Sequence, residues 1–90
     1  MDIVLKRSDK PDKKYMVKVD NKTIHFGSRG MSDFTKNKDP ERKNRYIARH
    51  KKRENWNDKF SPGALSRYIL WGEPSLRESI KKYKRKFRLK

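Results

Sequence analysis

Residues 14–26, with the sequence KYMVKVDNKTIHF, form the pattern that most restricts how this chain can fold. Asp20 and Asn21 stand at the centre, and both residue types tolerate the positive φ angles of a two-residue hairpin turn. Pairing across this turn places apolar side chains opposite one another on one face. The expected pairs are Val19 with Lys22, Val17 with Ile24, and Tyr15 with Phe26. The other face would carry Met16, Lys18, Thr23 and His25. Turn and pattern agree, so they predict an antiparallel hairpin.

The segments around the hairpin predict one more strand and about three helices. Residues 2–7, DIVLKR, are rich in β-forming residues, and a loop around Pro11 follows them. Each later segment opens with a side chain that can cap a helix N-terminus. These segments are a helix from Asp39-Pro40-Glu41 to about Arg53, a segment from Ser61-Pro62 to Gly72, and a helix opened by Ser75 and Glu78. The predicted fold class is α+β: a small N-terminal antiparallel sheet of about three strands, then about three α-helices, in a single domain over residues 1–90.

The last predicted helix combines an apolar stripe with a very basic end. The stripe consists of residues at i, i+4, i+7 and i+11, namely Leu76, Ile80, Tyr83 and Phe87. Residues 81–90, KKYKRKFRLK, contain seven cations. The end from about residue 84 to residue 90 can be a flexible basic tail, a nuclear-import signal or the basic end of a helix.

The charge balance restricts the partner. Lys and Arg number 27 against 11 acidic residues, a formal net charge of +16 on 90 residues. Such a surplus repels itself in the compact state of a small, marginally stable domain. We therefore expect a polyanionic partner, which is most simply nucleic acid; an anionic membrane is the next candidate.

Several classes of protein are disfavoured. The chain has no cysteine, which excludes disulfides and thiolate metal sites. No apolar run approaches the roughly 20 residues of a membrane span, and the first residues lack the apolar stretch of a signal peptide. We expect a protein that is not secreted.

Residues 40–56 contain the strongest candidate for a binding surface. On a helical wheel, six side chains fall within about 100° of one another. They are Arg42, Arg45, Arg49, Lys52, Arg53 and Trp56. Tyr46, Ile47 and His50 are expected to face the core. Five cations on one face do not alternate with acids as they do in a helix stabilised by ion pairs. A phosphate backbone would compensate them, and arginine binds phosphate through two N–H groups. The alternative is a solvated face that packing alone stabilises.

Weaker signals lie elsewhere. The sequence FGSRG can form an anion-binding nest around Arg29, or only a turn. Trp56 can stack on a base, whereas Trp71 is expected in the core. The candidate nucleic-acid-binding residues are Arg29, Arg42, Arg45, Arg49, Lys51, Lys52, Arg53, Trp56, Lys82, Lys84, Arg85 and Lys86.

Signatures of catalysis are missing from the sequence. There is no phosphate-binding glycine loop of the right form and no nucleophile with a base, so we expect no catalytic residue, metal or cofactor. His25 and His50 lack a carboxylate or second histidine close in sequence. The weakest alternative is a small nuclease with Mg²⁺ held by Asp33, Asp39 and Asp58. Asp39 has a simpler role as a helix cap.

Two long blocks of sequence resemble a known family. KTIHFGSRGMSDFTKNKDPERKNRYIARHKKRENW and LSRYILWGEPSLRESIKKYKRKF are similar to short basic proteins encoded by large DNA viruses of eukaryotes, a family defined by a domain of unknown function. The resemblance spans roughly residues 15–87 and carries over no catalytic or ligand residue. It implies that the chain comes from a virus, which must neutralise and pack a long DNA genome.

Charge and resemblance together predict a viral nucleic-acid-binding protein. We expect mainly nonspecific binding, to DNA more than RNA, for genome organisation or packaging in the virion or the viral factory, in the host cytoplasm or nucleus. Alternatively, the outer sheet face, with Lys18, Thr23 and His25, would contact a groove. The alternative function is a minor structural protein of the virion that binds acidic surfaces of other virion proteins.

Overall fold

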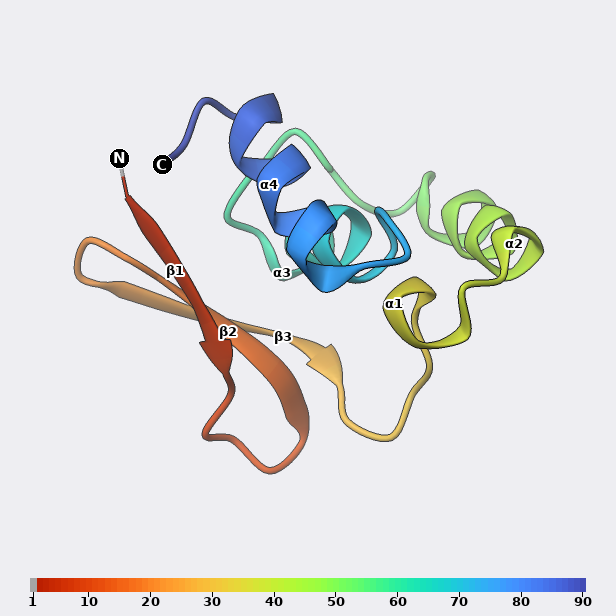
Figure 1. Cartoon of the computed structure of the whole chain (residues 1–90), viewed down its shortest axis with the longest axis horizontal. Coiled ribbons are helices and arrows are strands. Elements are labelled where there is room, and N and C mark those ends of the chain that lie inside the picture. Colours follow the sequence, from red (N-terminus) through yellow and green to blue (C-terminus); the bar gives the residue numbers. More distant parts are fainter. Residues whose placement is uncertain (1) are drawn as a thin grey trace.

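The computed structural model describes residues 2–90, in which a three-stranded antiparallel sheet precedes a group of helices (Figure 1). The strands are β1 (Ile3–Arg7), β2 (Lys13–Val19) and β3 (Lys22–Ser28), and β2 lies between the other two. The helices are α1 (Phe34–Asn37), α2 (Pro40–His50), α3 (Pro62–Leu65), the π-helical η1 (Ser66–Leu70) and α4 (Leu76–Lys86). The predicted α+β class is confirmed.

The hairpin forms with the predicted register. Val19 pairs with Lys22, and the pairing continues through Val17 with Ile24. Asp20 takes the positive φ of 51° that the turn requires. The face predicted to be apolar lies against the helices and buries Val17 completely. β1 adds to the free side of β2 and completes the sheet.

Gly27 distorts the end of this hairpin. Its φ is +79°, and a Cβ atom added there would lie 2.7 Å from Leu70 Cδ1. Only glycine combines this backbone conformation with so close an approach of the core. Lys14 lies opposite Gly27 and is buried. Its Nζ donates a 2.6 Å hydrogen bond to Asp33 Oδ2, so the two buried charges neutralise each other.

The helix caps follow the sequence, and the helix lengths do not. Asp39, Ser61 and Ser75 each accept backbone N–H groups of the next turn, as predicted. α2, however, ends at His50 rather than Arg53. The segment after Ser61 widens from α3 into η1, where the Trp71 N–H donates to the Ser66 carbonyl, five residues back. The short α1 was not predicted.

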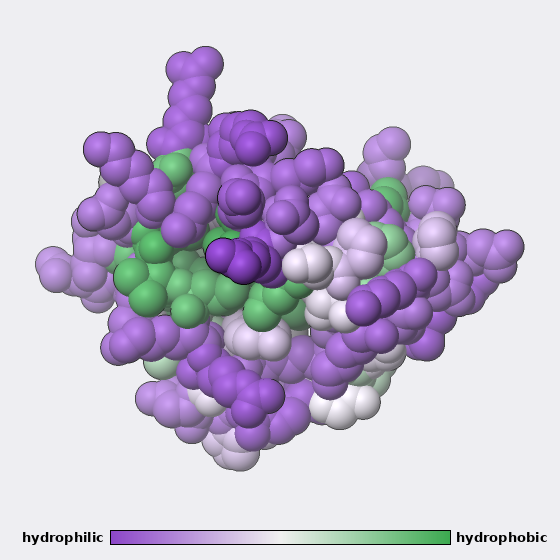
Figure 2. All heavy atoms as spheres, viewed as in Figure 1, coloured by the Kyte–Doolittle hydropathy of each residue, from purple (hydrophilic) through white to green (hydrophobic). Residues whose placement is uncertain are grey.

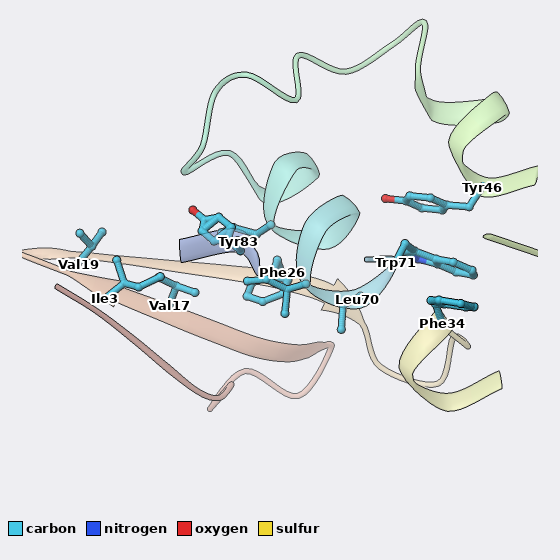
Figure 3. Packing of buried hydrophobic residues seen from close by; sticks show 11 residues of the cluster. Ile3, Val17, Val19, Phe26, Phe34, Tyr46, Leu70, Trp71 and Tyr83 are labelled. Carbon is cyan, nitrogen blue, oxygen red and sulfur yellow. The ribbon is translucent and has the colours of Figure 1, made fainter. Parts of the chain in front are cut away.

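The core joins the sheet to the helices through aromatic side chains (Figure 3). Trp71 stacks on Tyr46 with ring centroids 4.5 Å apart and planes 8° from parallel. Figure 3 shows Phe34 on the opposite side of Trp71. Tyr83 of the predicted α4 stripe is buried, and its hydroxyl donates a 2.5 Å hydrogen bond to the Lys59 carbonyl. This aromatic stack holds α2 against the rest of the domain.

The face that Figure 2 shows is mostly hydrophilic, with an apolar area between the sheet and α4. A shallow groove there is lined mainly by Ile3, Val4, Leu5, Leu76 and Ile80.

Tyr83 makes stability sensitive to alkaline pH. Burial raises the pKa of Tyr83 from 10.0 to about 12, and the charge of Asp58 adds to this shift. A pKa that is higher in the native state stabilises the fold fully below the unfolded-state pKa, and this contribution is lost as the pH rises through the native pKa. We expect the free energy of unfolding to fall by about 2–3 kcal/mol between about pH 10 and 12 from this group. Urea denaturation at stepwise pH would measure it.

The control for this expectation is Tyr83→Phe, which has no phenolic proton to lose. At neutral pH it should cost about 1 kcal/mol for the lost hydrogen bond, but its decline above about pH 10 should be shallower. An equally steep decline in both proteins would assign the alkaline instability to other groups.

Candidate nucleic-acid interface

Three arginines form a row along the exposed side of α2. Arg42, Arg45 and Arg49 are exposed, whereas Tyr46, on the neighbouring arc of the helix, is buried. Ile47 packs against the core, as predicted. The 11-residue helix begins at the Asp39 cap and has Pro40 as its first residue. Packing of the buried side therefore gives the arginine row a fixed direction.

The arginine row keeps most of its positive charge. Arg45 Nη1 lies 4.0 Å from Glu41 Oε2, and both side chains are more than half exposed. Pairs of this kind contribute little in water. Among residues 2–90, Arg42 and Arg49 make no ion pair. An approaching polyanion would thus meet three cations in line.

A cationic turn extends this row beyond the end of α2. Lys51, Lys52 and Arg53 are all exposed, and the Arg53 N–H donates to the His50 carbonyl. Cations next to a helix C-terminus interact favourably with its partial negative charge. We call the six cations of α2 and this turn the α2 basic surface; they are Arg42, Arg45, Arg49, Lys51, Lys52 and Arg53.

The predicted extension of one helical face as far as Trp56 is wrong. Trp56 Nε1 donates a 3.0 Å hydrogen bond to Glu54 Oε2, and this carboxylate lies 3.6 Å from His50 Nδ1. The Asn57 N–H also bonds the Asn55 side chain, a local bond that competes with helix. The chain therefore leaves the helix after His50, and Lys52, Arg53 and Trp56 lie outside it.

Trp56 is half-buried. The Arg67 guanidinium carbon lies 5.4 Å from the centre of its ring. A base could stack on this face of Trp56 only if it displaced the guanidinium group. Trp71, predicted to be in the core, is buried there.

Arg29 holds a loop in place. Its Nε and Nη2 atoms donate to backbone carbonyls between 2.9 and 3.4 Å away. These carbonyls belong to Ser8, Lys10 and Lys13. The N–H groups of Arg29 and Met31 bond the carbonyls of Asp12 and Ser28. Of the two alternatives left open by the sequence, these bonds favour the turn over the nest, because the two amides are used within the protein.

The cations of α4 are more engaged than those of α2. Lys82 Nζ donates a 2.5 Å hydrogen bond to Glu73 Oε1, and this bond lowers the pKa of Glu73. Lys86 lies 5.2 Å from the Tyr68 ring centroid, and Lys84 is half-buried. Arg85 is exposed.

The C-terminal end is attached to the N-terminal strand. The Ile3 N–H donates a 2.9 Å hydrogen bond to the Lys90 carbonyl. Figure 1 shows this end beside β1, whereas α2 lies at the other end of the domain. The structure thus does not bring Lys84, Arg85 and Lys86 together with the α2 basic surface.

Two lysines of β2 line a cavity together with residues of α2, which the sequence interpretation did not indicate, although Lys14 is neutralised by Asp33 and adds no free charge there. Lys13 and Lys14 line a cavity of about 330 Å³ with Arg49 and His50. No local periodicity connects residues so far apart in sequence. Lys43, by contrast, lies on the inner side of α2, where its Nζ donates to the Gly72 carbonyl at 2.6 Å. Burial lowers the pKa of Lys43, and the nearby charge of Arg67 adds to this effect.

Residues 2–90 show neither the arrangement of a metal site nor that of a membrane-spanning helix. Over residues 2–90, no cluster of three histidine or acidic side chains is arranged to hold a metal ion. Asp33 and Asp39 instead cap α1 and α2. No helix in this part of the chain has the length and apolar character needed to cross a bilayer.

A family model described as a family of unknown function, DUF5754, matches residues 3–50. This range covers the sheet, α1 and all of α2, more than half of the chain. Comparisons with curated proteins and with solved structures gave no match.

Proposed function

The chain belongs to the DUF5754 family, and we propose that it is a non-enzymatic protein that binds nucleic acid through the α2 basic surface. The observation that carries this proposal is the row of exposed arginines on a helix anchored by buried aromatic rings. Their guanidinium groups suit the oxygens of successive phosphates. Contacts of this kind position a protein on a duplex without reading its sequence.

The rigidity of α2 lowers the entropic cost of binding. Each long side chain that is ordered on binding costs about 0.5–1.5 kcal/mol. On α2 the backbone is already fixed, and the buried Tyr46 prevents the helix from turning its arginines away. The ordering cost is therefore lower than for the same cations on a mobile segment.

The outer face of the sheet supports binding less well. Lys18 and Thr23 are exposed, but Met16 is buried. His25 Nδ1 shares a 2.7 Å hydrogen bond with the Ser8 hydroxyl. This face has few free cations, so we place the contact on α2.

The proposed role is genome organisation or packaging in a large DNA virus, in the virion or the viral factory. A net charge of +16 suits a protein that must neutralise phosphates rather than select a sequence. DNA is the proposed partner because nonspecific phosphate contacts are sufficient for packing a duplex genome.

The test is the salt dependence of duplex-DNA binding. Each neutralised phosphate lowers log K by about 0.9 per unit of log salt, so the six cations predict a slope steeper than about −5. Fluorescence anisotropy with two unrelated duplexes at several salt concentrations would measure it, and both duplexes should bind alike. Equal binding at low and high salt would contradict the proposal. A protein that instead binds acidic protein surfaces would purify at low salt without the ultraviolet absorbance of nucleic acid.

A further inference from the structure

A second cationic feature lies at the sheet end, away from the exposed side of α2. A cavity of about 170 Å³ opens between β1, β2, the turn after β3 and α1. Its lining residues are Arg7, Lys14, Tyr15, Arg29, Gly30 and Lys36. Four of these six carry a positive charge, and none is acidic. We propose that this cavity is a binding site for a phosphate monoester.

The charge of the cavity lacks a counterion. Lys14 is paired with the buried Asp33 at 2.6 Å. Arg7, Arg29 and Lys36 are exposed, and none of them forms an ion pair within the described chain. Like charges gathered around one small space repel each other. A bound anion would remove this repulsion.

One arginine that lines the cavity is already oriented. Carbonyl oxygens of Ser8, Lys10 and Lys13 hold the Nε and Nη2 atoms of Arg29. In residues 2–90, none of the hydrogen bonds uses Arg29 Nη1, which keeps its two N–H donors for a ligand. Arg7 is held as the last residue of β1, where it pairs with Tyr15. The Arg29 guanidinium therefore needs little further ordering, and the backbone of Arg7 is fixed.

The cations favour a monoester over the internal phosphates of a duplex. A phosphate monoester carries about −1.5 to −2 charge at neutral pH and has three strong acceptor oxygens. A phosphodiester has a single charge and only two unesterified oxygens, so it would gain less from the same cations. The shared chemistry is a terminal phosphate, either at the end of a nucleic acid or on a free small molecule.

This site is separate from the α2 basic surface, because the two have no residue in common. Its test therefore does not depend on the proposed function. A protein that fails to bind duplex DNA through α2 would still bind phosphate, and the reverse also holds.

The experiment compares inorganic phosphate binding by wild type and by Arg7→Gln/Lys36→Gln. Both replaced side chains are exposed, so the fold should persist, as circular dichroism would verify. The matched control is Lys18→Gln/Lys22→Gln, which removes two exposed cations from the opposite end of the same sheet. Calorimetric titration at constant ionic strength gives Kd. Heteronuclear NMR shows whether the Gly30 amide shifts.

We expect the Arg7/Lys36 variant to bind inorganic phosphate at least about tenfold more weakly than wild type, and the control to bind like wild type. Phosphate about tenfold above Kd should raise the Tm of wild type by roughly 6 °C or more. Equal Kd values for wild type and the Arg7/Lys36 variant would overturn the proposal, and so would an unmoved Gly30 amide.

Single-stranded oligonucleotides with and without a 5′-phosphate distinguish the two sources. If the terminal phosphate increases affinity in wild type but not in the Arg7/Lys36 variant, the ligand is the end of a nucleic acid. If inorganic phosphate binds in the cavity and the two oligonucleotides bind alike, the site takes a free phosphate compound. The absence of both effects would remove the site.

Discussion

Replacing Arg42, Arg45 and Arg49 together by Gln should weaken binding to duplex DNA by about 500-fold at about 0.1 M salt. Each lost phosphate contact lowers log K by about 0.9 for each unit of log salt below about 1 M, so three lost contacts lower it by about 2.7. Binding to unrelated duplexes should weaken equally, since the contacts read no base. The slope of log K against log salt should become shallower by about 2.7, the contribution of three contacts. Fluorescence anisotropy at several salt concentrations gives both quantities.

Stability should hardly change in this variant. All three side chains are exposed, and Gln has nearly the helix propensity of Arg. Removing like charges from neighbouring turns also relieves repulsion within the helix. A large drop in Tm would mean that the arginines hold the fold together, and the loss of binding would then say nothing about contact.

The matched control is Lys84→Gln/Arg85→Gln/Lys86→Gln, which also removes three cations. Lys84 is half-buried and Lys86 lies against Tyr68, so their ammonium groups are less available than the α2 arginines. Phe87 and the apolar stripe of α4 stay intact. We expect a clearly smaller loss of affinity than in the α2 variant. If the α4 variant binds DNA more weakly, the contact lies at the C-terminal end and α2 is a solvated helix.

The parts of the fold that depend on neighbours in sequence were predictable. The turn at Asp20 and the cap at Ser75 each use atoms within three residues of each other. The alternation that buries Val17 and Phe26 is likewise a local pattern with period two. Strand pairing, the starts of α2, α3 and α4, and the inner side of α2 could therefore be predicted from sequence.

The parts that depend on distant residues were not predictable. Asp33 is paired with Lys14, 19 positions away, and Arg29 bonds the Ser8 carbonyl, 21 positions away. Arg29 therefore acts on a loop instead of forming a nest.

The end of α2 was missed for another reason. The Asn57 N–H bonds the Asn55 side chain instead of a helical carbonyl, and a helical wheel does not weigh this competition.

The candidate interface likewise combines features that follow from local sequence with features that only tertiary packing creates. The arginine row was predictable because it is helical. The cavity that Lys13 and Arg49 both line was not, because only tertiary packing forms it. The phosphate cavity also gathers β1, β2 and α1, so no single stretch of sequence announces it.

Replacing Trp71 by Ala should cost about 3–5 kcal/mol of unfolding free energy, the usual range for removing a buried tryptophan. Trp71 is only 9% exposed and stacks on Tyr46 at 4.5 Å. Domains of this size have about 5–15 kcal/mol of stability in total. The loss should therefore leave this highly charged protein close to unfolding at room temperature. Urea denaturation followed by circular dichroism measures it.

Two further variants separate the aromatic stack from burial in general. Trp71→Phe keeps an aromatic ring against Tyr46 and should recover at least half of the loss. Val4→Ala removes methyl groups from a side chain that is 49% exposed and should change stability by less than about 0.5 kcal/mol.

Trp71 also connects stability to the proposed DNA binding, because its stack holds the arginine row of α2 in a fixed direction. Under conditions where Trp71→Ala is still folded, its DNA affinity should therefore fall although no cation has been removed. Unchanged affinity in that folded variant would show that the charge of α2 suffices and that its orientation does not matter.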